Sequence, residues 1–493
     1  MKRIAVIGGG IAGVSAAYEL ALQQRAGAPI EFTLFEATDR LGGTVETERK
    51  GEFVLECGPD SWVTEKPWAR ELAVELGLED QIIASQDDHR RTYLAEGRTL
   101  QPMPDGMRMM VPFQWAGVLN SPLFSWQAKL AYLREPKIAE ELKASALANH
   151  ESSRDESVRD FVFRHFGAEV ADTIAAPLLA GVFGGEIATL SARAVLGPYV
   201  ALEREHGSLV LGLQRRLQEQ AEQGKTPASV FTTLRNGLGG LIEGMEARIP
   251  DRSVRKRTAM NSVARAGGRW QLFASPSQTA RQQPEDFDAV VLATPAKATA
   301  RLLAPLDPRM AELLPQHSSS AIVAAFAFTP EQAREMRVPR GFGFLVPQRT
   351  GSAEPVADSS LDALAQRALL ACTFVDQKFP HRAPPGAALL RVFFGGAAAP
   401  GLLQEDNETL LSLAHRALGK ILGKLPEPKI SLVRRWPDSL PQYEAGHLDR
   451  VAELEARAAT HSGLRLIGNA YHGVGLPDLI RAGRMAARAM IQS

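Results

Sequence analysis

The sequence is poor in cysteine: its 493 residues include only Cys57 and Cys372. The two form no CxxC pair and no metal-ligand spacing, so the sequence contains neither a disulfide framework nor a metal motif. This scarcity is typical of proteins from a reducing compartment. The sequence also shows no Ser-His-Asp set and no paired-carboxylate signature.

Net charge is absent as well, because 56 Lys and Arg residues balance 56 Asp and Glu residues. Composition therefore gives no support for a nucleic-acid partner, and we expect none. No window reaches the roughly 18 uninterrupted apolar residues of a membrane-spanning helix. The first apolar run stops at Gly8-Gly9-Gly10, too early for a secretory signal. We therefore expect a cytoplasmic protein without a metal.

The length exceeds what one hydrophobic core supports and predicts two or three subdomains. Apolar periodicity predicts strands at 3–7 and 30–35 around a helix at 11–24, and a mostly helical stretch at 136–225. The remaining predicted elements are strands at 269–273, 288–293, 321–328, 342–346, 388–394 and 464–467, and a final helix at 476–492.

Gly8, Gly10 and Gly13 form the pattern G-x-G-x-x-G between the first predicted strand and helix. The first glycine permits a tight turn, the second a close approach to a pyrophosphate, and the third close packing of helix on strand. The helix N-terminus then faces the phosphates with free N–H groups. Glu36, which ends the second strand, can accept hydrogen bonds from ribose hydroxyls. A glycine turn without a ligand is the alternative, but the full context favours a dinucleotide, either FAD or NAD.

The residues after the second strand separate these two cofactors. Arg40-Leu41-Gly42-Gly43-Thr44 resembles the extension found in flavin amine oxidase-like proteins. Its glycines permit backbone approach to the pyrophosphate and flavin side of the cofactor, and Arg40 can neutralise phosphate charge. A simple turn with a surface arginine is the alternative. We therefore predict FAD.

Segments spread over nearly the whole chain resemble the porphyrinogen oxidases of haem synthesis, within the flavin amine oxidase-like superfamily. These segments are 58–61, 102–104, 156–161, 177–185, 236–241, 341–347, 435–443, 446–447 and 468–478. No single segment is decisive, and the resemblance depends on their order and spacing. It implies an FAD-dependent, oxygen-using oxidase that converts coproporphyrinogen III to coproporphyrin III, with protoporphyrinogen IX as the close alternative.

The resemblance also implies a mixed α/β (α+β) fold with discontinuous domains. We expect a Rossmann-type FAD-binding domain (1–85, 226–300 and 430–493), a sheet-based substrate domain (86–100 and 301–429) and a helical subdomain (101–225). Trp436 would lie beside the flavin, and Met260 in a strand that holds the adenine. The turn at 468–478 would place a helix N-terminus at the flavin, where it can stabilise negative charge on the reduced ring. That turn lacks the cysteine that links flavin in some amine oxidases, so we expect noncovalent FAD.

Carried over residue by residue, the resemblance implies a set of cofactor-binding residues. They are Gly8, Gly9, Gly10, Ile11, Ala12, Gly13, Glu36, Ala37, Arg40, Gly42, Gly43, Thr44, Gly58, Pro59, Asp60, Ser61, Met260, Trp436, Gly468, Val474, Gly475 and Leu476.

For the substrate, the resemblance implies a macrocycle between Leu370 and Phe393, with the Gly181 carbonyl accepting pyrrole N–H bonds. Arg91 stands where some family members carry an arginine that could pair with a propionate. These are also common core residue types, so a packing role is the alternative for Leu370, Phe393 and Gly181. The implied reaction is hydride transfer from a meso carbon to flavin N5 in successive two-electron steps, with O2 as the final acceptor. The cofactor then carries the difficult chemistry, and no residue is assigned as a catalytic acid or base.

Other functions stay open at this level. One is an amine oxidase or carotenoid desaturase on the same scaffold, and another is a flavoprotein that binds or transfers porphyrin without catalysis. The Met- and aromatic-rich segment 100–135 is either a domain core or an amphipathic surface. Peripheral contact with the inner face of the membrane and contact with another haem-pathway enzyme are open partner questions, as is the oligomeric state.

Overall fold

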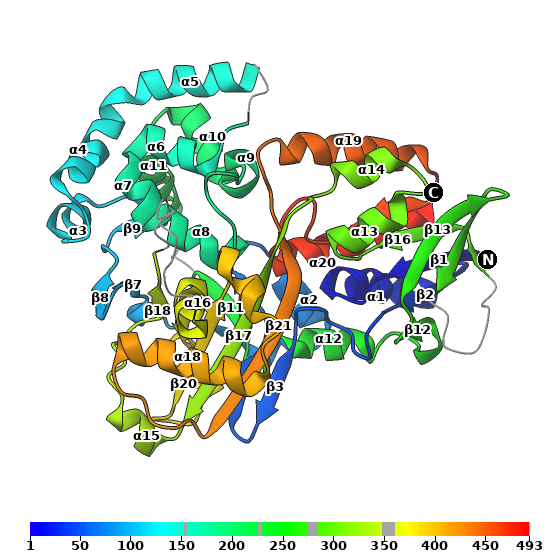
Figure 1. The fold of residues 1–493 in the computed structure, drawn as a ribbon. Coiled ribbons are helices and arrows are strands. Elements are labelled where there is room, and N and C mark those ends of the chain that lie inside the picture. Colours follow the sequence, from blue (N-terminus) through cyan, green and yellow to red (C-terminus); the bar gives the residue numbers. More distant parts are fainter. Residues whose placement is uncertain (152–154, 225–228, 275–283, 348–359, 493) are drawn as a thin grey trace.

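The computed structural model describes residues 1–151, 155–224, 229–274, 284–347 and 360–492. Its first unit is built on a five-stranded parallel sheet and includes both the first strand and the last helix of the chain (Figure 1). The strand order is β12 (Val254–Arg255), β2 (Ile30–Phe35), β1 (Lys2–Ile7), β16 (Ala289–Leu292) and β22 (Leu464–Leu466). The central strands β1 and β16 consist mainly of buried apolar residues because structure covers both faces of the sheet.

Three helices cover one face of this sheet: α1 (Ile11–Arg25), α12 (Gly239–Glu246) and α20 (Leu476–Gln492). An alanine Cβ at Gly483 of α20 would lie 2.2 Å from the Ala12 carbonyl oxygen, so the two helices touch along their backbones. Glu19 of α1, almost fully buried, accepts from Arg484 Nε (2.7 Å) and Arg488 Nε (2.8 Å) of α20. The last helix of the chain is thereby fixed against the first.

The opposite face is covered by a small antiparallel sheet and three helices. These elements are β13 (Met260–Ala266), β14 (Arg269–Ala274), β15 (Glu285–Phe287), α13 (Ala296–Leu303), α14 (Pro308–Leu313) and α19 (His447–Thr460). Shorter elements join this unit to the rest of the chain. They are β3 (Thr47–Lys50), β4 (Phe53–Glu56), β5 (Trp62–Val63), α2 (Trp68–Glu75), β6 (Ile82–Ala84) and β11 (Phe231–Leu234).

The second unit is a seven-stranded sheet in the order β21-β17-β20-β19-β18-β7-β8. Its strands are β7 (Thr92–Glu96), β8 (Thr99–Pro102), β17 (Ser318–Phe328), β18 (Gly343–Leu345), β19 (Leu369–Phe374), β20 (Ala388–Phe394) and β21 (Ile430–Pro441). Helices α16 (Leu361–Ala368) and α18 (Asn407–Leu422) pack on one face. The other face meets the β3–β4 hairpin through Phe53, Leu55 and Cys57, which brings the two units into contact.

The third unit is helical and lies at one end of the molecule (Figure 1). It contains α3 (Trp115–Asn120), α4 (Trp126–Arg134), α5 (Ala139–Glu151), α6 (Val158–Phe166), α7 (Ala168–Val170), α8 (Ala176–Phe183), α9 (Ala192–Val195), α10 (Gly197–His206) and α11 (Leu209–Glu222). Serine hydroxyls cap α4, α6, α9 and α11 by accepting a backbone N–H from the first turn, which explains where these helices begin.

The segment 100–135 mainly forms the core of this helical unit. Met110 and Phe124 are buried there. On α4, however, Trp126 is 77% and Leu130 61% exposed, so part of the segment is an apolar surface. Among the described residues, no helix combines the length and the apolar character that crossing a bilayer requires.

The predicted strands and helices of the first unit are present almost to the residue, and the mixed fold class is confirmed. In the seven-stranded sheet, sequence patterns missed β7, β8, β19 and β21. The division into domains stays a prediction, and one strand bears on its boundary at 430. β21 lies within the predicted FAD-binding domain but pairs with β17 of the seven-stranded sheet.

Candidate functional site

The glycine turn between β1 and α1 has space for a ligand at one position only. An ideal Cβ on Gly8 would lie 2.6 Å from the Ala293 carbonyl oxygen, and one on Gly13 would lie 1.9 Å from the Gly8 carbonyl oxygen. Gly10 differs, because a Cβ there would meet no atom of the chain within 4 Å. The protein therefore fills the space around the first and third glycines and leaves open the space in front of the second. This is the arrangement that the approach of a pyrophosphate requires.

The N-terminus of α1 is prepared for an anion. Gly10 caps the helix without a side-chain hydrogen bond, and the first turn contains no acidic residue. The N–H groups of the first turn are therefore not taken by an acidic side chain of the helix itself. Ile11 and Ala12, both buried, belong to this turn. The site accordingly fits a phosphate group.

Glu36 anchors the glycine turn from the end of β2. Its Oε2 accepts the Gly9 N–H (2.7 Å), and its Oε1 accepts the backbone N–H (2.7 Å) and hydroxyl (2.8 Å) of Thr38. Ala37 follows it and is exposed. Glu36 also connects to the predicted adenine strand, because its carbonyl accepts the Thr258 N–H (2.8 Å) two residues before Met260. Met260 is buried at the start of β13.

The extension 40–44 lies against the glycine turn. The Gly42 N–H donates to the Gly9 carbonyl (2.7 Å), and a Cβ on Gly43 would lie 3.1 Å from Gly10 Cα. Arg40 makes an ion pair with Glu46 (3.0 Å), and its guanidinium lies 5.6 Å from the centre of the Trp436 ring. Two distant predicted cofactor residues are therefore neighbours.

The turn 58–61 joins the same group. A Cβ on Gly58 would lie 1.9 Å from the Thr44 carbonyl oxygen, so only glycine fits here. Trp436 Nε1 donates to the Cys57 carbonyl (2.7 Å), which holds β21 against this turn. Burial raises the pKa of the Cys57 thiol to about 12, so the thiol stays protonated and acts in packing.

The turn 468–478 is fixed by an aromatic pair. The Tyr443 hydroxyl donates to the Asn469 carbonyl (2.6 Å) and accepts the Gly473 N–H (3.1 Å). The Tyr443 ring stacks on His447, with 3.9 Å between the ring centres. Burial lowers the pKa of His447 to about 4, so this ring is neutral. The pair holds Gly468, Val474 and Gly475 in front of Leu476, where α20 begins.

The predicted substrate residues divide into two groups. Leu370 lies at a register shift of β19, beside Phe393 of β20. A Cβ on Gly395 would lie 2.4 Å from Cδ1 of Leu370. Gly181 is exposed on α8, which packs on β18 and β19, and its nearest neighbour is Leu345 (3.7 Å from an ideal Cβ). The structure therefore places Leu370, Phe393 and Gly181 in one region.

Arg91 is not part of that group. It is exposed beside Phe342, at the end of β18 opposite Leu345, and its carbonyl accepts the Phe342 N–H (2.8 Å). The length of β18 separates these ends by roughly 7–10 Å. A role in binding a propionate would require the substrate to reach across this strand.

Sequence reasoning missed three buried cations, Lys378, Arg382 and Arg391. Arg391 is 1% exposed on β20, in the sequence Leu389-Leu390-Arg391-Val392-Phe393. An arginine inside an apolar strand was the available signal, because such a charge is buried only with a partner. That partner is Asp60, 3.2 Å from its Nη1.

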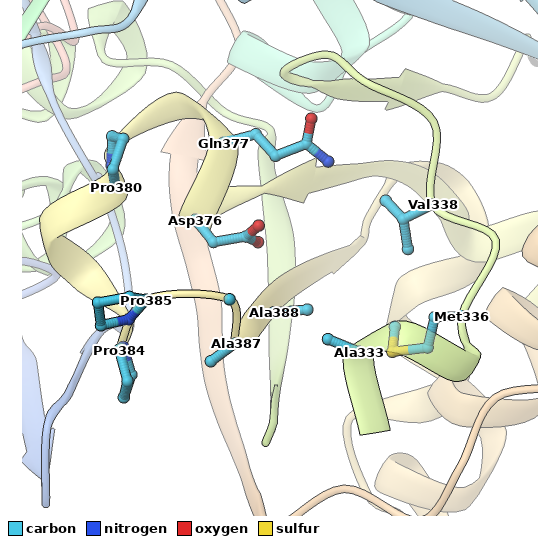
Figure 2. Close-up of a pocket in the computed structure, with 11 residues that line it drawn as sticks. Ala333, Met336, Val338, Asp376, Gln377, Pro380, Pro384, Pro385, Ala387 and Ala388 are labelled. Carbon is cyan, nitrogen blue, oxygen red and sulfur yellow. The ribbon is translucent and has the colours of Figure 1, made fainter. Parts of the chain in front are cut away.

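A cavity of about 340 Å³ lies elsewhere, between α15 (Pro330–Glu335) and the start of β20 (Figure 2). The Asp376 carboxylate points toward it and accepts the Leu389 N–H (2.9 Å). Burial raises the pKa of Asp376 to about 6. Ala388 on its wall and Phe393 are separated by roughly 16 Å along the strand, and none of the predicted site residues lines this cavity.

The parallel sheet, the glycine turn open at Gly10 and Glu36 at the end of β2 define a dinucleotide-binding oxidoreductase fold. More narrowly, residues 11–491 match the family described as flavin containing amine oxidoreductase, and the chain belongs to this family. Membership implies a flavin cofactor, which the open glycine turn fits.

Several relatives match the chain from end to end. The coproporphyrinogen III oxidase of Bacillus subtilis (strain 168) is 31% identical over 489 residues, 98% of this chain and 97% of that protein. The chloroplastic protoporphyrinogen oxidase 1 of Arabidopsis thaliana is 28% identical over 491 residues, 96% of this chain and 84% of that protein. A crystal structure from Exiguobacterium sp. 255-15, assigned as a protoporphyrinogen oxidase, is 29% identical, with a TM-score of 0.79 over 100% of this chain and 99% of that one. These matches confirm the resemblance seen in the sequence.

Proposed function

We propose that this protein is an FAD-dependent oxidase that converts coproporphyrinogen III to coproporphyrin III in haem biosynthesis, with O2 as the electron acceptor. The observation that carries the proposal is the end-to-end similarity to coproporphyrinogen III oxidases from several bacteria. Protoporphyrinogen IX is the alternative substrate, because plant protoporphyrinogen oxidases also match 96% of the chain.

The cofactor is noncovalent FAD in this proposal, held by the predicted residues named above. Bound flavin supplies a two-electron acceptor for the substrate. The N–H groups of the first turn of α1 bind the pyrophosphate, Glu36 binds the ribose, and the start of α20 contributes its positive dipole end. The turn 468–478 contains no cysteine that could link the ring.

The substrate lies where the second and third units meet in this proposal. Leu370 and Phe393 present apolar side chains to the macrocycle and exclude water from it. The Gly181 carbonyl, on an exposed turn of α8, accepts a pyrrole N–H. An aromatic product drives the reaction, so these residues orient the ring without acting as acids or bases.

A peripheral membrane contact would use α4, whose Trp126, Leu130 and Leu133 are exposed. Their spacing puts all three on one side of the helix, which suits shallow insertion between lipid headgroups. Contact with another haem-pathway enzyme remains a second use for the same surface.

The proposal is tested by mixing the purified protein aerobically with coproporphyrinogen III or protoporphyrinogen IX and following porphyrin fluorescence. We expect a yellow protein that oxidises coproporphyrinogen III with the higher kcat/KM. A faster reaction with protoporphyrinogen IX would select the alternative substrate. A yellow protein that oxidises neither porphyrinogen would contradict the proposed function.

A further inference from the structure

Five charged side chains are buried where the segment 56–60 meets the seven-stranded sheet. They are Glu56, Asp60, Lys378, Arg382 and Arg391. At most 14% of any of these side chains is exposed. Arg382 and Glu56 form one pair (2.8 Å), which leaves Asp60 with two cations. Charge is expensive to bury, and a positive charge in excess of its counter-ions more so.

Arg391 contacts both halves of the proposed site. Its Nη2 donates to the Gly58 carbonyl, and its Nη1 lies 3.2 Å from Asp60, so it holds the turn proposed to contact the flavin. Its guanidinium lies 5.0 Å from the centre of the Phe393 ring, which is proposed to contact the macrocycle. Alternation along β20 puts Arg391 and Phe393 on the face directed toward the first unit.

Lys378 completes the cluster on the other side of Asp60. Its Nζ lies 3.1 Å from each carboxylate oxygen and 3.3 Å from the Ser61 hydroxyl. Although burial opposes ionisation, Lys378 and Arg391 hold the pKa of Asp60 well below its usual range. Burial lowers the pKa of Lys378, and the Asp60 carboxylate opposes that shift from 3.1 Å away. The two-oxygen contact with Asp60 favours the charged ammonium, so Asp60 lies between two cations.

Arg391 also has an unused donor. Its Nε is buried and has no hydrogen-bond partner among the described residues. A buried N–H without an acceptor is rare in folded proteins, and its cost is relieved when a bound group supplies one. The cluster thus offers both an excess of positive charge and an unmet donor next to the turn 58–61.

We propose that Arg391 is a positioning residue that fixes the turn 58–61 and Phe393 relative to each other, and that the Lys378–Asp60–Arg391 cluster stabilises negative charge on the reduced flavin. This inference rests on the proposed function for its cofactor and substrate. A fixed positive charge in a site with little water is effective because it needs no reorganisation when charge develops.

Two variants separate charge from position. Lys378→Met removes the second cation and leaves Asp60 with Arg391 alone. In the FAD-loaded variant, the equilibrium between reduced and oxidised flavin should shift about tenfold toward the oxidised form. That change lowers the two-electron midpoint potential by about 30 mV in an anaerobic dye-linked titration. Arg391→Lys keeps the charge but loses the planar fork and the ring contact. We expect its midpoint potential to change by less than that, while its KM for coproporphyrinogen III rises at least fivefold.

Arg416→Met is the matched control, because Arg416 pairs with Asp362 on the far side of the same sheet, 49% exposed. Both measured quantities should stay at the wild-type value there. A wild-type midpoint potential in Lys378→Met, or a wild-type KM in Arg391→Lys, would overturn the inference. The potential is measured without any porphyrinogen, so its shift stands even if the protein proves to oxidise another substrate. A protein that retains no FAD would overturn both proposals.

Discussion

Replacing Gly10 by alanine separates cofactor binding from folding in the glycine turn. The new methyl group meets no atom of the chain within 4 Å, and Gly10 already has φ −67° and ψ 174°, which any residue adopts. The free energy of unfolding of the cofactor-free protein should therefore fall by less than about 1 kcal/mol, the usual cost of a poorer N-cap. The methyl does occupy the space proposed for the pyrophosphate. We expect FAD to bind at least 100-fold more weakly, about 2.7 kcal/mol.

Gly13→Ala is the contrasting variant. Its methyl would lie 1.9 Å from the Gly8 carbonyl oxygen, so α1 must move away from β1. Overpacking of this kind costs roughly 1–3 kcal/mol, and the cofactor-free protein should lose that stability in urea unfolding. Gly419→Ala, in α18 of the second unit, also meets no atom within 4 Å and serves as the control for both measurements. If Gly10→Ala binds FAD with wild-type affinity, the open space at Gly10 is not the pyrophosphate site.

Two further predictions concern pH. Burial raises the pKa of Asp376 to about 6, so its ionisation reduces stability as the pH rises from about 4 to about 6. Asp376→Asn keeps an acceptor for the Leu389 N–H. Above pH 6 its free energy of unfolding should exceed that of the wild type by roughly 2 kcal/mol. Equal free energies of unfolding at pH 8 would refute this. His165 is buried between Glu135 (2.9 Å) and Glu203 (3.2 Å), and although burial opposes protonation, these carboxylates raise the pKa of the ring. The stability contributed by the charged His165 ring is fully present below about pH 6.5, the usual pKa of histidine. It is lost as the pH rises through the raised pKa of His165 in the folded protein. His165→Gln should therefore cost roughly 3 kcal/mol at pH 6 and less at pH 9, and a cost independent of pH would contradict this assignment.

Local patterns predicted the parts of the fold whose causes are local. The run Ile4–Ile7 before the glycines specifies β1 and the start of α1, because a buried parallel strand is continuously apolar and the turn needs glycine at fixed positions. β21 was missed for the opposite reason. Arg434, Arg435 and Trp436 give no apolar alternation, and this strand is specified by its pairing with β17, more than a hundred residues earlier in the chain.

The candidate site shows the same limit. Glu36 and the glycines were recognisable because the turn and the strand end follow each other closely in the sequence. Arg391 was not, since its role depends on Gly58 and Asp60, which lie more than 300 residues away along the chain. Arg91 was placed by resemblance alone, and the structure puts it at the other end of β18 from the remaining substrate residues.

The account is tested most directly by mixing the purified yellow protein with coproporphyrinogen III under strictly anaerobic conditions and recording the flavin absorbance. It predicts that each flavin bleaches on accepting two electrons. Porphyrin fluorescence therefore rises only when at least three equivalents of the protein are present per coproporphyrinogen III, because the porphyrin forms in three two-electron steps. Air restores the yellow band, and acid precipitation releases intact FAD into the supernatant. A flavin band that stays unchanged with coproporphyrinogen III and with protoporphyrinogen IX, yet bleaches with an amine, would contradict it.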